Sequence, residues 1–528
     1  MLKVLHEEAS KLNYYPRKVQ EKAIEWIESV WESNNICKVL SCPVGSGKSL
    51  IAKTIASYLA KEKMFTAIVT PQNILIDQYI SEFADLNYFK GKSHYSCKKT
   101  KSTCEVGIEL EKISKSPCTK CPYRIAKAKC YNNYTTIFNP MSYFNLSKVI
   151  NDSGKLEVIY NVNTIIVDEF QSLPSMLREL ITIKIWEHDI NWISGVSSSI
   201  PLVCELLEKY NELLEFYIIS PYVLKKEKLK IMLTQRRVDT ILSQLKKHSS
   251  YFICEESIEK YRNVNTKCLI IRPKYVPPSI YKNFFKIAKK IVFMSGTAFP
   301  FIWEELGFSK PDYIDLPSPI SKVRRPVYAT STIDISEKHK ENENRILSDL
   351  SEQIKYIVDY IHPEENGIIL LPYSLGTKIK PFLKEKHFIH MEKRTKSDKI
   401  LEFKESKERV VGIFSGSYEG LSLGGDLSRF TIIPKVPFPN LKDKVVSVRL
   451  KENNINYSME TITLIIQATG RSCRSETDYS ATYILDKNFG FLYCRTKEFL
   501  PKYFKDSVLF RTPNENDVIL FESFKKGK

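Results

Sequence analysis

The sequence predicts an α/β protein of two units, in each of which helices alternate with the strands of a parallel sheet. Helices and strands alternate up to about residue 90 and again from about residue 345 to 485. The stretch 42–49, Cys-Pro-Val-Gly-Ser-Gly-Lys-Ser, stands between a buried apolar run and a helix, and a later buried run ends in Asp168-Glu169. A Gly-rich turn paired with acidic residues at a strand end is typical of a phosphate-binding site.

Apolar residues at helical spacing predict the first helix, and short apolar runs predict the strands that follow it. The last strand of the first unit leads into Gly296-Thr297. The predicted elements of this unit are a helix over 17–31, a strand over 37–41, a helix over 48–60, a strand over 66–70, a helix over 72–84, a strand that ends at Asp168 and a strand over 290–295.

Two stretches interrupt the alternation in the first unit, which we place at residues 1–300. Residues 91–135 hold many lysines, five cysteines and few apolar residues, and we expect an inserted module that a metal stabilises. Residues 172–285 carry helical stripes and no α/β alternation, which predicts a second, mostly helical insert. A linker is expected at 301–335, where Pro, Ser and Arg are frequent, and a second unit at 336–528. The second unit is predicted to contain a helix near 345–361, strands at 367–371, 410–414 and 430–433, a helix near 460–470 and a strand over 481–485.

Composition limits the class of protein. The 528 residues are 43% hydrophobic, as in globular proteins, and the longest apolar runs are about as long as a strand, so no membrane span is expected. The N-terminal residues lack the apolar core of a signal peptide, so we expect an intracellular protein. The net charge of +18 favours a polyanionic partner such as nucleic acid, although a lysine-rich composition with ordinary solvated faces would give the same number.

The Gly-rich loop has the residues that bind a nucleoside triphosphate. Backbone N–H groups of such a loop point at phosphate, with the dipole of the following helix behind them. Lys48 is positioned to reach the β- and γ-phosphates, and the Ser49 hydroxyl can ligate Mg²⁺. At the other strand end, Asp168 suits the metal ion and Glu169 suits the attacking water. The loop residues expected at the nucleotide are Pro43, Val44, Gly45, Ser46, Gly47, Lys48 and Ser49.

Three polar residues of the second unit recur at helical spacing. Gln467, Arg471 and Arg474 stand at i, i+4 and i+7, which would put them on one helix face. From there the arginines could reach the nucleotide site of the first unit and stabilise charge on the γ-phosphoryl group, or they could form a solvated basic face. The Gly-rich stretch 415–426, with Gly424 and Asp426, could contact phosphates through backbone N–H groups.

Four cysteines of the first insert have spacing that suits a metal centre. Cys97, Cys104, Cys118 and Cys121 supply four thiolates, with Cys130 left over. An intracellular chain is not expected to hold them as disulfides. Four sulfurs suit zinc or a 4Fe–4S cluster, and spacing alone does not distinguish the two.

The ordered set of motifs resembles the XPD/DinG group of superfamily 2 DNA helicases over most of the chain. Arg17 and Gln20 resemble the adenine-contacting motif of that group, in which the glutamine bonds the base. Asp168-Glu-Phe-Gln171 stands where the group has Asp-Glu-Ala-His, a position that couples hydrolysis to the cleft. The other segments also resemble motifs of the group. Pro43–Ser49 resembles the phosphate loop, Thr70–Tyr79 a DNA-side motif, and Met294–Ala298 the Ser-Ala-Thr motif. Ser417–Asp426 with Lys435–Pro439 resembles the fifth motif and the segment after it, Gln467–Arg474 the sixth motif, and Leu485-Asp486 the strand end that follows the sixth motif.

The resemblance implies a fold of two RecA-like motor domains, with an iron–sulfur module and an arch-like helical domain inserted in the first. The stretch Cys121-Pro-Tyr-Arg matches the last cluster ligand of the group, which makes the four cysteines above the ligands of a 4Fe–4S cluster and leaves Cys130 outside it. Zinc remains the alternative.

The function that the resemblance implies is an ATP- and Mg²⁺-dependent helicase that moves 5′→3′ along single-stranded DNA and opens forked DNA, acting as a monomer. The alternatives are an RNA helicase, a translocase that does not separate strands, and a nucleic-acid-binding protein switched by nucleotide. ATPase and strand-separation assays with DNA and RNA distinguish them.

Overall fold

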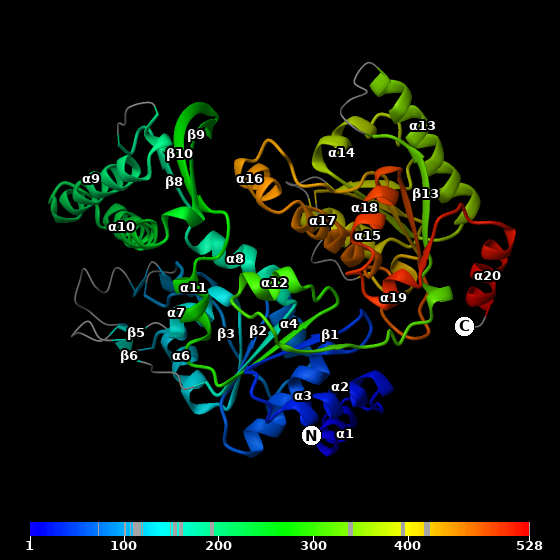
Figure 1. Cartoon of the computed structure of the whole chain (residues 1–528), viewed down its shortest axis with the longest axis horizontal. Coiled ribbons are helices and arrows are strands. Elements are labelled where there is room, and N and C mark those ends of the chain that lie inside the picture. Colours follow the sequence, from blue (N-terminus) through cyan, green and yellow to red (C-terminus); the bar gives the residue numbers. More distant parts are fainter. Residues whose placement is uncertain are drawn as a thin grey trace.

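The computed structural model of the chain describes residues 1–71, 73–99, 102–105, 107–108, 118, 120–147, 149–150, 156–157, 162–190, 195–335, 342–391, 396–416 and 423–526. Figure 1 shows two α/β bodies side by side, the first from the N-terminal part of the chain and the second from the C-terminal part. A helical and stranded insert projects from the first body and lies beside helix α16 of the second.

The first body is built on a seven-stranded sheet in the order β12-β1-β11-β7-β2-β4-β3, with every pairing parallel. Strands β1, β11 and β7 are neighbours, so the phosphate loop, Gly296 and Asp168 follow adjacent strand ends at one edge of the sheet. Ligands bind at this edge of parallel sheets. The strands are β1 (Cys37–Ser41), β2 (Thr66–Val69), β3 (Asn87–Phe89), β4 (Thr135–Phe138), β7 (Thr164–Asp168), β11 (Lys290–Ser295) and β12 (Asp312–Asp315).

Helices cover both faces of this sheet because alternate strand residues are apolar on each side. On one face, Leu40, Ile68 and Ile166 pack under the N-terminal helices, and on the other Val39, Val69 and Val167 pack under later ones. The first set is α1 (Leu2–Lys11), α2 (Lys18–Val30), α3 (Lys48–Lys61) and α4 (Asn73–Glu82), and the later helices are α6 (Pro122–Asn132), α7 (Pro140–Ser147), α8 (Leu173–Leu180), α11 (Pro278–Phe285) and α12 (Pro300–Glu305).

The second body repeats the architecture with a seven-stranded parallel sheet in the order β15-β16-β14-β17-β18-β13-β19. The two sheets confirm the predicted α/β class with two RecA-like units. The strands are β13 (Val327–Ile333), β14 (Gly367–Leu371), β15 (Phe388–Met391), β16 (Val411–Ser415), β17 (Phe430–Ile433), β18 (Ala481–Asp486) and β19 (Val508–Leu509). The helices are α13 (Glu343–Tyr356), continued by a π-helical turn (Ile357–Ile361), α14 (Tyr373–Ile379), α15 (Lys396–Glu405), α16 (Lys444–Glu452), α17 (Asn454–Thr469), α18 (Asn488–Thr496), α19 (Lys502–Lys505) and α20 (Glu515–Lys526).

The expectation that residues 172–285 are mostly helical is wrong in part. Helices α9 (Ile200–Ile219) and α10 (Lys225–Lys247) are long, but β8 (Ile183–Trp186), β9 (Phe252–Tyr261) and β10 (Val264–Pro273) form an antiparallel sheet in the order β8-β10-β9. Strands β9 and β10 are joined through Arg262 and Asn263, both with left-handed φ values of 48° and 70°. This turn lacks the glycine that usually signals a hairpin, so the sequence pattern did not reveal it.

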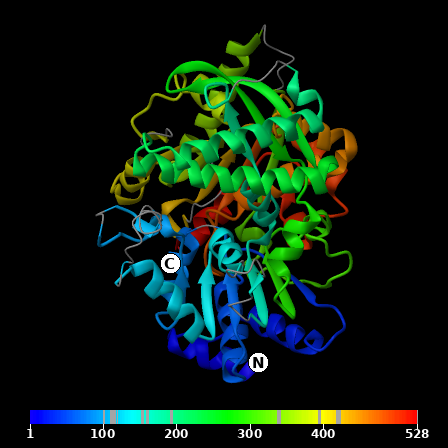
Figure 2. The same cartoon turned by 90° about the vertical axis from the view of Figure 1, so that its left-hand side faces the viewer.

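The insert also contacts the second body. Arg272 of β10 lies 2.7 Å from Asp443, the N-cap residue of α16, and Lys274 pairs with Glu452. Lys444 donates to the backbone oxygen of Cys254 at 3.2 Å. Seen from the side in Figure 2, α9 and α10 extend across the molecule above the first sheet. Residues of the insert therefore bind both bodies.

The connection between the two sheets is shorter than the expected linker at 301–335. Strand β12 pairs with β1 in the first sheet, and β13 pairs with β18 in the second, so the chain crosses between Asp315 and Val327. Ion pairing explains the position of β12, because the buried Lys38 ammonium lies 3.2 Å from Asp312. We call residues 316–326 the crossing segment.

Of the first insert, the structure describes α6 and the segments that carry the cysteines. A short antiparallel pair, β5 (Val149–Ile150) with β6 (Leu156–Glu157), follows α7. In the described part of the chain, no helix combines the length and the apolar character that crossing a bilayer needs.

Candidate active site

The phosphate loop leaves β1 and turns sharply into α3. Gly45 and Gly47 have left-handed φ values of 82° and 74°, which glycine adopts without steric cost. Cys42, which stands where glycine or alanine is usual, is not among the described residues with positive φ, so its side chain fits the backbone there. Its N–H donates to Ser295 O of β11 at 2.7 Å, which fixes the start of the loop. Helix α3 begins at Lys48 and directs its N-terminus into the loop.

One buried polar atom of the loop suits a phosphate ligand. The Ser46 hydroxyl is buried and has no hydrogen-bond partner among the described residues. Buried hydroxyls normally have partners, and a phosphate oxygen would supply one. A cavity of about 820 Å³ opens over the loop, large enough for a nucleotide. Its lining includes Tyr14, Tyr15, Arg17, Gln20, Asp168, Glu169, Arg474 and the loop from Pro43 to Ser49.

Arg17 and Gln20, expected at the adenine, line this cavity and also support the loop. The Arg17 guanidinium donates to Gly45 O, and its backbone N–H donates to Gln20 Oε1 at 2.8 Å. The end of the Gln20 side chain lies where a Cβ on Gly47 would stand, and glycine is favoured there by its left-handed φ. The start of α2 therefore packs directly on the phosphate loop.

Asp168 ends β7 and is almost fully buried. It accepts hydrogen bonds from the Tyr79 hydroxyl and the Glu169 N–H, each at 3.0 Å. Burial, followed by the charge of Glu169, raises the pKa of Asp168 to about 6. The Ser49 hydroxyl lies close to the same Tyr79 hydroxyl, so the two oxygens expected at Mg²⁺ are near one another. A hydroxyl and a carboxylate are the ligands that Mg²⁺ takes in such sites, and the residues fit this ion.

Glu169 lies beside Lys48 and has a left-handed backbone, with φ at 51°. Its Oε1 lies 2.9 Å from Lys48 Nζ, and its Oε2 accepts from Gln171 Nε2 at 2.8 Å. Burial acts to raise the pKa of Glu169, but the Lys48 charge and the Gln171 hydrogen bond outweigh it and the pKa is lowered. The carboxylate is therefore ionised, as a group that accepts a proton from water must be.

Gln171 links Glu169 to the neighbouring strand end. Its Oε1 accepts a hydrogen bond from the Ser295 hydroxyl at 2.5 Å, and Ser295 Oγ accepts from the Thr297 N–H at 2.9 Å. The glutamine thus bridges the acidic motif and the turn after β11. Gln171 stands where the group has histidine, and its hydrogen bonds still connect the acidic motif at Glu169 with the turn at Ser295.

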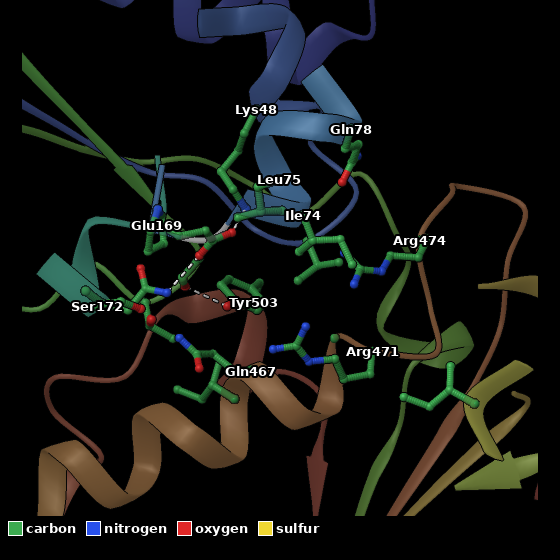
Figure 3. A pocket seen from close by; sticks show the side chains of 18 of the residues that line it. Lys48, Ile74, Leu75, Gln78, Glu169, Ser172, Gln467, Arg471, Arg474 and Tyr503 are labelled. Carbon is green, nitrogen blue, oxygen red and sulfur yellow. Dashed lines mark hydrogen bonds and ion pairs between the residues drawn. The ribbon is translucent and has the colours of Figure 1, made fainter. Parts of the chain in front are cut away.

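The helical spacing predicted for the second-unit residues is wrong in part. Helix α17 ends at Thr469, so Gln467 lies in its last turn, whereas Arg471 and Arg474 follow in a loop. The chain leaves the helix at Gly470, and the Arg471 N–H bonds Ala468 O at 3.1 Å in a turn. All three side chains still line one cavity of about 250 Å³ together with Lys48 and Glu169, as Figure 3 shows.

Gly424 and Asp426 do not line either cavity in the described structure. Gly424 packs against Arg474, because a side chain there would meet Arg474 Cγ at 3.0 Å. Asp426 is 82% exposed and pairs with Arg429 at 2.7 Å. The motif residues 417–422 lie outside the described residues.

Gly470 brings the two units into contact at the phosphate loop. A Cβ on Gly470 would lie 2.4 Å from Val44 Cγ2, and no L side chain fits without movement. We predict that Gly470→Ala pushes the arginine loop away from Lys48 and lowers kcat for ATP about 100-fold, the scale of a 1 Å displacement in an active site. Steady-state ATPase kinetics measures this.

Val44 offers the matched control for this change. Val44→Ala removes the methyl group that the new side chain would meet, so the double variant should recover most of the kcat that Gly470→Ala loses. Full activity in Gly470→Ala alone would show that the two units do not approach at this point during turnover.

Several side chains line the nucleotide site although no motif assigns them to it. Leu75, Gln78 and Tyr79 of α4, expected on a DNA-side motif, instead face the nucleotide cavities or Asp168. From the second unit, Lys404 and Tyr503 line the smaller cavity. The position of Lys404 and Tyr503 at this cavity depends on how the two units pack together, which the spacing of residues in the sequence does not encode.

The cysteines of the first insert gather in a cluster of their own. Cys97, Cys104 and Cys121 are buried together, and Cys118 packs against them. The sulfurs of Cys104 and Cys121 lie 3.8 Å apart. Cys130 instead belongs to the main core, where its thiol donates to Ala126 O at 3.2 Å. The four-sulfur donor set suits a cluster or zinc, although the described residues contain no ready-made metal-binding geometry.

Comparison with known proteins agrees with this geometry. A family model described as a helicase C-terminal domain matches residues 365–507, and one described as the res subunit of type III restriction enzymes matches residues 13–185. Comparison with curated proteins found no match. Among solved structures, an XPD helicase is 16% identical with a TM-score of 0.60, and the match covers 94% of this chain and 99% of the other.

These matches identify a helicase C-terminal domain at residues 365–507 and show that the chain has the fold of XPD helicases over most of its length. A solved apo XPD structure is 16% identical, with a TM-score of 0.55 and coverage of 91% of this chain and 98% of that one. An Xpd protein of S. tokodaii is 14% identical, with a TM-score of 0.54 and coverage of 94% and 100%. The match to a helicase C-terminal domain supports an ATP-hydrolysing helicase.

Proposed function

We propose that this helicase uses ATP to translocate along single-stranded DNA and to separate a forked duplex. The observation that carries the proposal is the shared cavity, in which Lys48 and Glu169 of one sheet meet Arg471 and Arg474 of the other. A site completed only when two units meet can convert hydrolysis into relative motion. The net charge of +18 supports a polyanionic track. The 5′→3′ direction and the monomeric state come from the resemblance to the group.

The residues divide the work of hydrolysis between the two units. The loop N–H groups and Lys48 bind the β- and γ-phosphates, and Arg17 and Gln20 hold the loop and face the base end of the cavity. Ser49 and Asp168 would hold Mg²⁺, which would neutralise charge on the phosphate oxygens. Glu169 accepts a proton from the attacking water. Gln467 lines the same cavity as Arg471 and Arg474, which stabilise the charge that develops on the γ-phosphoryl group.

The domain organisation follows the two sheets. We propose residues 1–300 as the first motor domain, with the cysteine module at 91–135 and the arch-like insert at 172–285, and residues 336–528 as the second. Outside these bounds, β12 belongs to the first sheet and β13 to the second, and α8 and α11 at the two ends of the second insert pack on the first sheet.

Two assays on the purified protein test the function. ATP turnover is measured alone, with single-stranded DNA and with RNA, and strand separation is measured on forked DNA with 5′ and 3′ tails. We expect stimulation by single-stranded DNA and opening of the fork with a 5′ tail. Stimulation by RNA alone would support an RNA helicase, ATPase without strand separation a translocase, and nucleotide binding without turnover a switch.

We propose that Cys97, Cys104, Cys118 and Cys121 hold a 4Fe–4S cluster. Three of these thiols share a buried cluster that has few other apolar members, so a cross-link is needed to hold the module together. One observation favours the alternative. The 3.8 Å between the sulfurs of Cys104 and Cys121 equals the spacing of two thiolates on one tetrahedral zinc with bonds of about 2.3 Å.

Cys118→Ser is expected to lose the bound metal and to unfold the module locally. Each motor domain has a core of its own, so the variant should keep ATPase activity and lose strand separation. Metal analysis and the visible absorbance of anaerobically purified protein measure the centre. Cys130→Ser is the control, because its thiol lies in the main core, and it should keep the metal. Stoichiometric zinc in colourless protein would refute the cluster, and loss of iron in Cys130→Ser would refute the ligand assignment.

A further inference from the structure

Tyr503 crosses from the second unit into the first. It lies on α19, and its hydroxyl donates to Gly296 O, directly after β11, at 2.8 Å. Its ring lines the same cavity as Lys48, Glu169 and Arg471, and Figure 3 shows it beside Glu169. Burial raises the pKa of Tyr503 far above that of a free tyrosine, so the hydroxyl remains a donor at neutral pH.

The crossing segment fixes Tyr503 from behind. Arg325 Nη1 donates to Tyr503 O at 2.7 Å, Nε donates to Ile320 O at 2.9 Å, and the guanidinium lies 5.4 Å from the centre of the Tyr503 ring. Ile320 in turn packs on the phosphate loop, because a side chain on Gly45 would meet its Cδ1 at 3.0 Å. The position of the ring is therefore tied to the segment that joins the two sheets.

On the first unit, the bonded carbonyl stands next to the residues that orient Glu169. Gly296 follows Ser295, whose hydroxyl donates to Gln171, and Gln171 donates to Glu169. A displacement of the Gly296 carbonyl changes the turn that holds Ser295 and, through Gln171, the direction of the carboxylate. The Tyr503 hydroxyl is thus connected to Glu169 through the Gly296 carbonyl, the adjoining residue Ser295 and the side chain of Gln171.

We propose that Tyr503 is a positioning residue that makes the orientation of Glu169 depend on closure of the two units. When the second unit is seated, the hydroxyl bonds Gly296 and the turn after β11 holds Gln171 against Glu169. When the units separate, this bond is lost and the carboxylate is less well directed. The inference rests on the proposed ATPase activity. It adds that a residue near the C-terminal end of the second unit helps to orient the carboxylate that accepts the proton from water.

Tyr503→Phe tests the proposal because it removes only the hydroxyl and keeps the ring that contacts Arg325. We expect kcat for ATP to fall about threefold to tenfold, the effect of one lost hydrogen bond, with KM for ATP changed less than about twofold. Steady-state ATPase kinetics, with and without single-stranded DNA, measures both constants. The melting temperature shows whether the fold is kept.

Tyr493→Phe is the matched control, since Tyr493 lies on α18 of the same unit and packs against Phe510 away from both cavities. It should keep the wild-type kcat. A wild-type kcat in Tyr503→Phe, a raised KM alone, or an equal loss in Tyr493→Phe would each overturn the positioning role. Wild-type protein that hydrolyses no ATP would overturn the proposed function with it, whereas an active wild type with an unaffected Tyr503→Phe would overturn the positioning role alone.

Discussion

Glu169→Gln is expected to reduce ATP turnover by at least 1,000-fold, on the order of the loss when a catalytic carboxylate is removed. The amide cannot accept a proton from water, and the ion pair with Lys48 at 2.9 Å is lost. Lys48 is then free to bind phosphate, so ATP binding should be retained. Turnover is measured by phosphate release, and binding by the fluorescence of a labelled ATP analogue.

Lys48→Ala separates binding from chemistry at the same site. It removes the cation that holds the β- and γ-phosphates, so both ATP binding and turnover should fall. The two variants should therefore differ in binding while they agree in turnover. Turnover near the wild-type rate in either variant would contradict the assignment of the site.

Arg471→Ala is expected to lower kcat about 1,000-fold while changing ATP affinity much less. The arginine lines the cavity opposite Lys48 and comes from the other unit, so its charge acts mainly where negative charge develops in the transition state. Steady-state kinetics and equilibrium ATP binding measure the two effects. The control is Arg495→Ala on α18, an arginine outside the described cavity lining, which should be active.

A different result for Arg471→Ala would reassign the residue. Normal ATPase with weakened binding of single-stranded DNA would mean that the loop after α17 faces nucleic acid. A loss of ATP affinity equal to the loss of kcat would mean that the arginine contacts the ground-state nucleotide.

The parts of the site that the sequence predicted are those made by adjacent residues. The phosphate loop from Pro43 to Ser49 and the pair Asp168-Glu169 each follow a buried strand, and local pattern suffices to place them at a sheet edge. Both sheets could be predicted for the same reason, since the apolar runs of parallel strands are buried on both faces.

The parts that could not be predicted depend on contacts between distant segments. Tyr503 lies 207 residues from Gly296, and Gly470 meets Val44 across the cleft, so neither contact leaves a local pattern. The helical spacing of Arg471 and Arg474 was misleading because Gly470 ends the helix before them. The hairpin β9–β10 was missed because its turn uses Arg262 and Asn263 in place of glycine.

The insert that carries β8 to β10 affects how the two bodies can move. It leaves the first body after α8, and its residues Arg272 and Lys274 pair with Asp443 and Glu452 at either end of α16. The bodies are thus held together at α16 as well as at the crossing segment and at the contacts made by Tyr503 and Gly470. Any rotation that widens the nucleotide cavity must also displace the hairpin or stretch these ion pairs. Because these pairs are in contact and their side chains are only 18–39% exposed, salt screens them weakly, and this second connection should persist at ordinary ionic strength.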